Sequence, residues 1–96
     1  MESYPSYIGG EWREGTGPRV EKNLNPANTD DVIGTVRYAT RAETRSAIDA
    51  AAQAQPAWKR VPGPERGRVV FRAAAVMARR KEEIARMLTR EEGKIL

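Results

Sequence analysis

The feature that most restricts the fold of this chain is a long amphipathic stretch at residues 64–92. Apolar side chains recur in it at steps of three and four residues, the spacing of one face of an α-helix; they are Val70, Ala73, Ala74, Met77, Ile84 and Leu88. One unbroken helix over this stretch would be about 43 Å long, whereas a compact domain of this length has a diameter of only about 32 Å. We therefore expect either a break near residues 79–81, where the apolar stripe is interrupted, or contact with protein outside this chain.

The supply of large apolar side chains also limits what the chain can build. Ile, Leu, Val and Phe together account for 16 of the 96 residues, which is below the roughly 20 percent at which a composition begins to lack material for its own core. The net charge of +4 is too small to hold the chain unfolded by repulsion. We expect a sequence that folds but leaves part of the helical stripe uncovered.

The first helix is predicted over residues 40–61. Thr40 and Glu43 have the spacing of a capping box, in which each side chain accepts a hydrogen bond from the backbone amide of the other residue. Pro56 is expected to end the regular part of this helix, because its ring disfavours helical backbone at Gln55. The residues beyond it would then form a further short turn.

Proline and glycine residues also mark the ends of the second helix, which is predicted over residues 64–92. Pro64 suits the first helical position, with Gly63 as the residue that caps it. Gly93 is typical of the position that follows the last turn. The apolar pair at residues 95–96 is expected to begin a further buried segment.

Patterns with a period of two residues predict an antiparallel β region over residues 7–39. A Gly-Gly pair at residues 9–10 indicates a tight hairpin rather than a phosphate-binding loop, since no helix follows it. Residues 19–25 and 32–39 alternate in character, and the turn-forming segment 26–31 is expected to be the loop between them. The predicted fold class is α+β, with three or four short antiparallel strands followed by two amphipathic helices, the second long or broken.

Two residue types that carry much of enzyme chemistry are absent. The sequence has no cysteine, which excludes a disulfide, a thiol nucleophile and any cysteine-based metal site. It also has no histidine, the commonest general base. The carboxylates show no ligand spacing and are interpreted as solvated surface; they include Asp30, Asp31, Asp49, Glu82, Glu83, Glu91 and Glu92. The side chains that remain available for chemistry are carboxylates, Lys, Tyr and Ser/Thr.

Arginine side chains gather on the side of the second helix opposite the apolar stripe, at Arg68, Arg72, Arg79, Arg86 and Arg90. Residues 59–94 carry a net charge of +6 and residues 1–58 a net charge of −2, an asymmetry that is also found in nucleic-acid-binding proteins. Acidic residues four positions away offset part of this charge, and no aromatic side chains are interleaved with it. We prefer a solvated helix face; the alternative is a short non-catalytic basic helical module that binds nucleic acid or a protein partner.

Four stretches, taken in order, resemble the N-terminal segment of the NAD(P)-dependent aldehyde dehydrogenase superfamily. They are YIGGEW, NPANTDDVIGTVRYAT, AIDAAAQAQPAWKRV and PERGRVVFRAAAVMARRKEEIARMLTREEGK, and they cover nearly all of residues 7–94. The resemblance is closest to bacterial semialdehyde dehydrogenases, including those that act on 2-oxoglutarate semialdehyde. It implies that residues 1–96 form the N-terminal part of the cofactor-binding domain in a Rossmann-like α/β parent, without the catalytic domain.

The resemblance also implies the chemistry of the parent enzyme. A cysteine thiolate attacks the aldehyde, a hydride passes to NAD or NADP, and water activated by a glutamate hydrolyses the thioester. In this family the cysteine, the glutamate and the glycine-rich cofactor loop all lie downstream of such a segment, so the resemblance implies no catalytic residue and no cofactor-binding residue within residues 1–96. The chain by itself is therefore expected to be inactive and to bind no cofactor.

One binding site is implied by the resemblance. The backbone carbonyls of Asn23 and Leu24 would be ligands of a monovalent or divalent cation, and the other ligands would come from downstream. The implied partners are the remainder of the dehydrogenase chain and further copies in a homo-oligomer, not nucleic acid. The sequence shows no signal-peptide core and no apolar run near the roughly 20 residues of a membrane span, so we expect a cytoplasmic protein.

Overall fold

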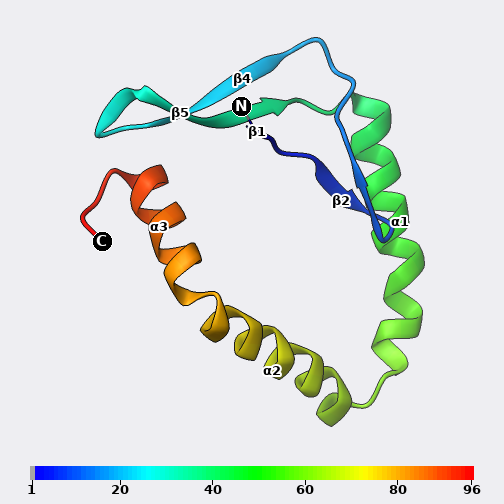
Figure 1. Ribbon diagram of the computed structural model, residues 1–96. Coiled ribbons are helices and arrows are strands. Elements are labelled where there is room, and N and C mark those ends of the chain that lie inside the picture. Colours follow the sequence, from blue (N-terminus) through cyan, green and yellow to red (C-terminus); the bar gives the residue numbers. More distant parts are fainter. Residues whose placement is uncertain (1) are drawn as a thin grey trace.

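Five short strands come first in the chain and three helices follow them in the computed structural model, which describes residues 2–96 (Figure 1). The strands are β1 (Glu2–Ser3), β2 (Ser6–Ile8), β3 (Glu11–Arg13), β4 (Val20–Asn25) and β5 (Asn28–Arg37). The helices are α1 (Arg41–Arg60), α2 (Gly63–Arg79) and α3 (Lys81–Glu92). The predicted α+β class is confirmed, with one strand more than expected and a second helical stretch that is broken in two.

The strands form two separate sheets. β2 and β3 pair with each other, and the other sheet has the strand order β1–β5–β4. β4 runs antiparallel to β5, as predicted, but β1 runs parallel to β5, with Glu2 opposite Gly34. The predicted antiparallel pairing within residues 7–39 is confirmed, and β1, which lies before that region, adds a parallel strand that the sequence analysis did not predict. Side chains alternate along a strand in both arrangements, so the sequence pattern does not encode the direction of a neighbouring strand.

The predicted hairpin at residues 9–10 is confirmed. Gly9 and Gly10 have φ angles of 60° and 85°, the positive values that a two-residue turn of this kind requires at both central positions. The turn places Tyr7 opposite Trp12, and the centroids of the two rings are 5.0 Å apart. The glycine pair therefore serves to pair β2 with β3.

The turn between β4 and β5 is shorter than predicted. A two-residue turn replaces the predicted loop at residues 26–31, because Asn25 pairs with Asn28. The Asn25 side chain accepts a hydrogen bond from the amide of Ala27 at 2.9 Å, and the Asn28 side chain accepts one from the amide of Asp30 at 3.2 Å. Local bonds of this kind tighten a turn, so β5 begins inside the predicted loop.

Helix α1 begins with the predicted capping box. The amide of Glu43 donates to the Thr40 hydroxyl at 3.1 Å, and the amide of Thr40 donates to the Glu43 carboxylate at 2.7 Å. The predicted end at Pro56 is wrong, because the helix continues through it to Arg60. The proline lies near the C-terminal end of α1, where its missing N–H removes one hydrogen bond, and alanine, the best helix former, is frequent around it.

Helices α2 and α3 meet at Arg80, which has φ −99° and ψ 17° and belongs to neither helix. The break lies in the predicted interval 79–81. The start of α2 differs from the prediction by one residue, because Pro62 is the capping residue and its carbonyl already accepts a helical hydrogen bond. Gly63 is therefore the first helical residue and Pro64 the second.

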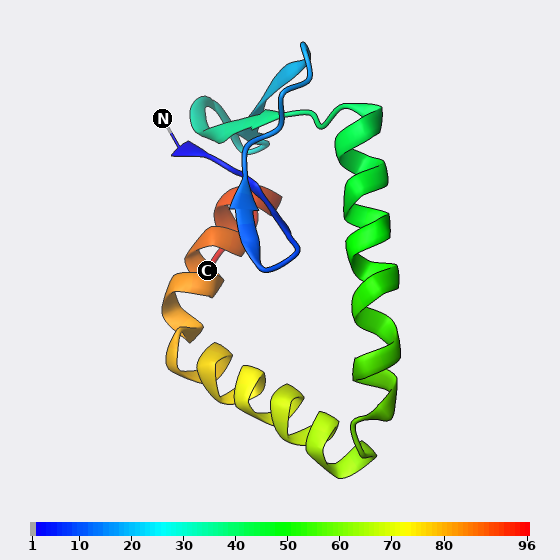
Figure 2. The same ribbon diagram turned by 90° about the vertical axis from the view of Figure 1, so that its right-hand side faces the viewer.

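The elements enclose an open frame (Figures 1 and 2). Helix α1 descends from the sheet, α2 crosses beneath it, and α3 returns to the sheet. The radius of gyration is 17.0 Å, against about 12–13 Å for a compact chain of this length.

Ile33, which is 3% exposed, is the only buried apolar side chain among residues 2–96. Val70 and Met77 of the predicted stripe are 67% and 59% exposed, so the expectation of an uncovered stripe is confirmed.

Candidate functional site

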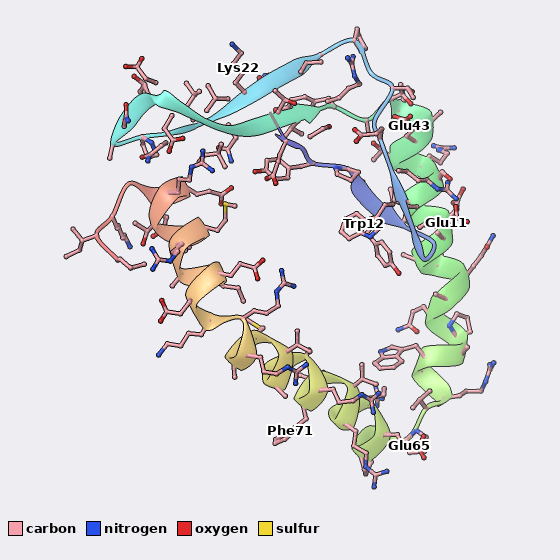
Figure 3. The ribbon with its side chains drawn as sticks, viewed as in Figure 1. Glu11, Trp12, Lys22, Glu43, Glu65 and Phe71 are labelled. Atoms are coloured by element: carbon pink, nitrogen blue, oxygen red, sulfur yellow. The ribbon has the colours of Figure 1, made fainter. Side chains whose placement is uncertain are left out.

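The most extensive feature of residues 2–96 is a set of uncovered apolar side chains on α2, α3 and the β2–β3 hairpin. We call it the inner apolar surface; it comprises the α2 and α3 side chains Val70, Met77, Ile84 and Leu88 and the hairpin side chains Tyr7 and Trp12. Trp12 is 70% exposed and points into the frame (Figure 3). On α3 a hollow of about 350 Å³ is lined by Arg80, Glu83, Ile84, Met87, Leu88 and Glu91. Exposed apolar area of this extent is typical of a docking surface for other protein.

The frame is closed where α3 returns to the sheet. The Arg90 guanidinium donates two hydrogen bonds to the Asp31 carboxylate, Nε to Oδ2 at 2.8 Å and Nη2 to Oδ1 at 2.5 Å. These bonds, and a further one from Asn25 Nδ2 at 3.2 Å, lower the pKa of Asp31 from 3.8 to about 2. The side chains of Arg90 and Asp31 are 39% and 27% exposed, so solvent screens part of the attraction.

A second polar contact lies beside this pair. Asn23 Nδ2 donates to Glu91 Oε1 at 2.8 Å and so joins β4 to the last turn of α3.

Gly93 ends α3 with a φ of 70°, as predicted. A Cβ atom at this position would come within 3.0 Å of the Ala27 amide nitrogen. Both the backbone conformation and the close approach to the β4–β5 turn therefore require glycine.

The predicted cation ligands, the backbone carbonyls of Asn23 and Leu24, lie in β4 next to this contact. The register between β4 and β5 shifts on both sides of Leu24, and such a bulge locally interrupts the hydrogen-bonded ladder. No group of three or more Asp, Glu, His or Cys side chains within residues 2–96 is arranged to hold a metal ion. A complete cation site at Asn23 and Leu24 therefore needs further ligands, and it stays a prediction.

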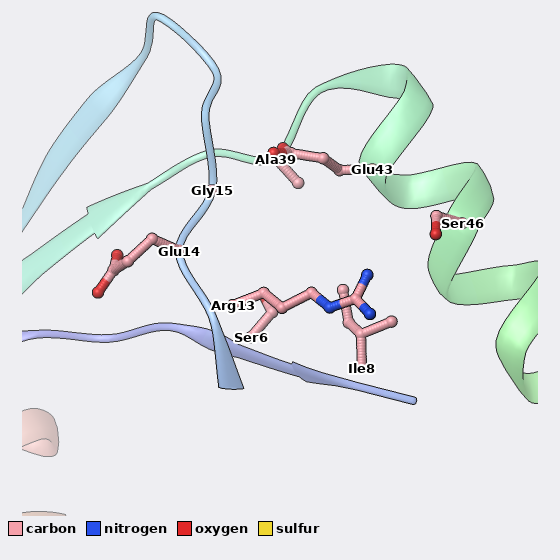
Figure 4. A pocket seen from close by; sticks show the side chains of 8 residues that line it. All are labelled: Ser6, Ile8, Arg13, Glu14, Gly15, Ala39, Glu43 and Ser46. Atoms are coloured by element: carbon pink, nitrogen blue, oxygen red, sulfur yellow. The ribbon is translucent and has the colours of Figure 1, made fainter. Parts of the chain in front are cut away.

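A pocket of about 160 Å³ lies between the β2–β3 hairpin, the loop that follows it and helix α1 (Figure 4). It is lined by Ser6, Ile8, Arg13, Glu14, Gly15, Ala39, Glu43 and Ser46. The Glu43 carboxylate accepts hydrogen bonds from the hydroxyl of Thr16 at 2.6 Å and from its amide at 3.1 Å, in addition to the bond from Thr40. The bonds from Thr16 and Thr40 lower the pKa of Glu43 from 4.5 to about 2.

These bonds decide what Glu43 can do. A general acid or base works best when its pKa is near the pH of the reaction, and a pKa of about 2 is far from neutrality. The carboxylate also occupies the positive N-terminal end of α1, which would otherwise attract a phosphate or another anion. Glu43 therefore joins the loop to the helix at one wall of this pocket, and it is poorly suited to act there as a general acid or base.

Sequence reasoning missed the residues that hold the frame together. The interpretation of Asp31 as a solvated carboxylate is wrong, because its side chain is only 27% exposed and accepts two hydrogen bonds from Arg90. Glu91 is exposed, as expected, and it also accepts a hydrogen bond from Asn23. Their partners are 59 and 68 residues away in the sequence, and Thr16 is 27 residues from Glu43. Periodic patterns describe the element in which a residue lies and carry no signal for such distant partners. Only Glu43 had a local signal, its capping box.

None of the helices in the described part of the chain combines the length and apolarity that a membrane span requires.

The aldehyde dehydrogenase family model matches residues 12–96. The alpha-ketoglutaric semialdehyde dehydrogenase of Bacillus subtilis strain 168 is 38% identical over 96 residues, which are 100% of this chain and 20% of that protein. The alpha-ketoglutarate semialdehyde dehydrogenase of Haloferax volcanii is 37% identical over 89 residues, 93% of this chain and 18% of that protein.

A solved structure shows the same relationship. The crystal structure of a NAD-dependent benzaldehyde dehydrogenase from Corynebacterium glutamicum matches with a TM-score of 0.85 and 34% sequence identity. The match covers 95% of this chain and 20% of that one. The chain therefore spans about a fifth of the length of the relatives that it matches.

Proposed function

This chain belongs to the aldehyde dehydrogenase family, and on that premise we propose that residues 1–96 are the N-terminal part of the cofactor-binding domain of a semialdehyde dehydrogenase. One observation carries the proposal. The similarity covers 93–100% of this chain but only 18–20% of the two semialdehyde dehydrogenases. The remainder of such an enzyme would supply the protein that the inner apolar surface needs.

The reaction proposed for the complete enzyme is the oxidation of an aldehyde to a carboxylate. A cysteine thiolate adds to the aldehyde carbon, loss of a hydride leaves a thioester, and water activated by a glutamate hydrolyses the thioester. NAD or NADP, when bound, accepts the hydride. The nucleophile has to come from another part of the enzyme, because these residues include no cysteine. By themselves they are not catalytically competent.

Within that enzyme we assign this segment a structural role. The inner apolar surface would pack on the rest of the cofactor-binding domain, and the Arg90–Asp31 pair would set the position of α3. The groups present do not fit a dinucleotide, because the Gly9–Gly10 turn is followed by a strand and not by a helix. The carboxylate of Glu43 fills the N-terminal end of α1. NAD(P) would therefore be held by residues outside this segment.

A cation site is part of the proposal. The carbonyls of Asn23 and Leu24 would provide two of its ligands, at the bulge that interrupts the β4–β5 ladder. Hard cations such as Mg²⁺ prefer oxygen ligands, and backbone carbonyls are among the oxygens that proteins offer. The position of Glu91, which Asn23 holds at 2.8 Å, would keep negative charge close to the ion. The remaining ligands would come from the rest of the enzyme.

The proposed substrate class is the semialdehyde of a dicarboxylic acid, such as 2-oxoglutarate semialdehyde. This choice rests on the names of the two relatives from Bacillus subtilis and Haloferax volcanii, because no substrate-binding residue is assigned in the segment. We further propose a cytoplasmic homo-oligomer whose interactions are with the remainder of its own chain and with further subunits, and not with a membrane or nucleic acid.

The experiment that tests this function uses the complete reading frame that contains these residues. The purified product is mixed with NAD or NADP and with 2-oxoglutarate semialdehyde, benzaldehyde or a simple aliphatic aldehyde, and the formation of NAD(P)H is followed by absorbance. We expect the highest kcat/KM for the semialdehyde and no turnover by the 96-residue chain alone. Absence of turnover with every aldehyde and both cofactors would refute the proposal. Turnover that favours benzaldehyde would refute only the substrate class.

A further inference from the structure

Gly34 is buried within strand β5, and its own backbone conformation does not explain why a glycine stands there. It is not among the glycines that have a positive φ angle, so other residues could adopt its conformation. The reason is a close approach. A Cβ atom at this position would come within 2.4 Å of the Tyr4 ring and within 2.8 Å of the Glu2 carbonyl oxygen. The missing side chain of Gly34 therefore makes room for the beginning of the chain.

Residues 2–4, which we call the N-terminal strap, lie along β5. Strand β1 pairs with β5 in parallel, and two bonds of Tyr4 extend this pairing. The amide of Tyr4 donates to the Thr35 carbonyl at 3.1 Å, and its hydroxyl donates to the Ile33 carbonyl at 3.2 Å. The tyrosine is thus bonded to β5 on both sides of Gly34, and its ring fills the space that Gly34 leaves free.

The N-terminal strap also reaches two other parts of the chain. The Ser3 hydroxyl donates to the Glu14 carboxylate at 3.0 Å, which ties the strap to the segment after β3. Burial and the carboxylate of Glu2 raise the pKa of the Tyr4 hydroxyl above its ordinary value of 10.0, and the guanidinium of Arg90 on α3 opposes part of this rise. The tyrosine hydroxyl therefore lies within electrostatic reach of the residue that holds α3 on the sheet.

The strap has a further effect on the sheet. The strand order is β1–β5–β4, so within residues 2–96 it is β1 that covers one edge of β5. An uncovered strand edge presents free backbone groups that can pair with another chain, and proteins cover such edges for that reason. Strand β5 also carries Ile33, the buried apolar side chain. Release of the strap would therefore expose an edge of the strand that holds this small core.

We propose that the N-terminal strap is a conformational device, in which Tyr4 occupies the space over Gly34, protects the edge of β5 and keeps β5 and the end of α3 in one arrangement. The inference rests on contacts within this chain and goes beyond the proposed function, since aldehyde oxidation does not enter it. The family model matches residues 12–96, so the strap itself lies before the matched region.

The first experiment introduces Gly34→Ala into the complete protein and follows hydrogen exchange by mass spectrometry. The added Cβ would meet a backbone oxygen of the strap, so the variant is expected to release it. Exchange at residues 2–4 and 33–35 should become about tenfold faster or more. Gly67→Ala on α2 is the matched control, because a Cβ there meets no atom of residues 2–96 within 4 Å. Exchange that is equal in the two variants would overturn the inference.

The second experiment combines Gly34→Ala with deletion of residues 2–4. Each change alone is expected to lower the Tm and to speed exchange in the last turn of α3. The combination should be no worse than the deletion alone, because the added methyl group no longer meets the strap. Additive losses would show that Gly34 serves another purpose, and unchanged exchange in α3 would refute the connection to that helix. Either result contradicts the proposal.

The third experiment separates the ring of Tyr4 from its hydroxyl. Tyr4→Phe keeps the ring and loses the bond to the Ile33 carbonyl, so it should retain most of the protection of β5. Tyr4→Ala should behave like the deletion and should scatter more light on warming, because the edge of β5 is open. Equal loss of protection in the two variants, or no added scattering by Tyr4→Ala, would contradict the proposal.

The design also covers failure of a variant or of the proposed function. If Gly34→Ala does not fold by circular dichroism, the comparison of Tyr4→Phe with Tyr4→Ala decides. Exchange, Tm and light scattering need no aldehyde and no cofactor. The strap is therefore tested even if the complete protein oxidises none of the aldehydes.

Discussion

The guanidinium of Arg90 and the carboxylate of Asp31, 59 residues apart in the sequence, form a two-point ion pair that closes the frame between α3 and β5. Planar groups that meet in this way fix an orientation as well as a distance. The adjacent bond between Asn23 and Glu91 ties the same end of α3 to β4. The direction in which the inner apolar surface faces therefore depends on a few polar side chains rather than on a buried core.

Replacement of Arg90 by alanine is expected to loosen α3. The helix would lose its two bonds to Asp31, so its backbone amides should exchange with solvent faster and the Tm of the complete enzyme should fall by a few degrees. Hydrogen exchange followed by mass spectrometry measures the local effect. Arg86→Ala, one turn earlier on α3, is the matched control, because Arg86 has no ion-pair partner within residues 2–96. Equal protection in the two variants would contradict the assigned role of Arg90.

Stability that depends on Asp31 and Glu43 is expected to be lost only in acid. Their pKa values are lowered from 3.8 and 4.5 to about 2, so the folded state binds fewer protons than the unfolded state. The stabilisation is complete above the two unfolded values and disappears as the pH falls to about 2. The Tm difference between the unmodified protein and Asp31→Asn or Glu43→Gln should therefore shrink in that acid range. A difference that shrinks around neutral pH would point to other groups.

Loss of the Thr40 cap is expected to destabilise the start of α1. The Thr40 hydroxyl accepts the amide of Glu43 at 3.1 Å, and replacement of such a cap by alanine typically costs about 1 kcal/mol. Thr40→Ala should therefore lower the free energy of unfolding by about that amount in denaturant titration. Ser46→Ala, within the same helix and away from its end, is the control and should leave stability nearly unchanged.

Truncation of Met77 is expected to change the stability of the 96-residue chain much less than that of the complete enzyme. In the 96-residue chain its side chain is 59% exposed, so Met77→Ala should reduce binding of a hydrophobic dye and change stability little. In the complete enzyme the same side chain would be buried under the proposed function, and its loss should cost about 2–5 kcal/mol. A small effect in both contexts would show that the inner apolar surface is not covered as proposed.

Removal of cations is expected to destabilise the complete enzyme if the carbonyls of Asn23 and Leu24 are ligands. The Tm should fall when sodium, potassium and magnesium are replaced by a bulky ammonium salt at equal ionic strength, and it should recover when the metal is returned. Asn23→Ala keeps the backbone carbonyl, so the cation effect should persist in this variant although its bond to Glu91 is lost. A Tm that does not respond to these cations would contradict the proposed cation site at Asn23 and Leu24.

Local features of the chain could be predicted because their causes lie within one turn. The Gly9–Gly10 pair can adopt positive φ at both positions, and Thr40 with Glu43 can exchange hydrogen bonds across a single helical turn. The break near Arg80 was visible as an interruption of the apolar stripe. The prediction failed at Pro56, where favourable alanine neighbours outweigh one lost hydrogen bond, and at Asn28, where side-chain bonds to the backbone shorten the turn.

The sequence by itself determined most of the order of strands and helices, the shortage of core and the uncovered stripe, because each of these follows from residue types and their spacing. The family was indicated by the resemblance of four sequence stretches to a known superfamily. Only the tertiary structure decided that β1 runs parallel to β5, that Arg90 meets Asp31, and that Tyr4 packs over Gly34. The physical reason is that these relationships join groups far apart in the chain or set the direction of a whole element. A pattern read along the sequence describes one element at a time, and it is the packing of elements against each other that selects among the remaining arrangements.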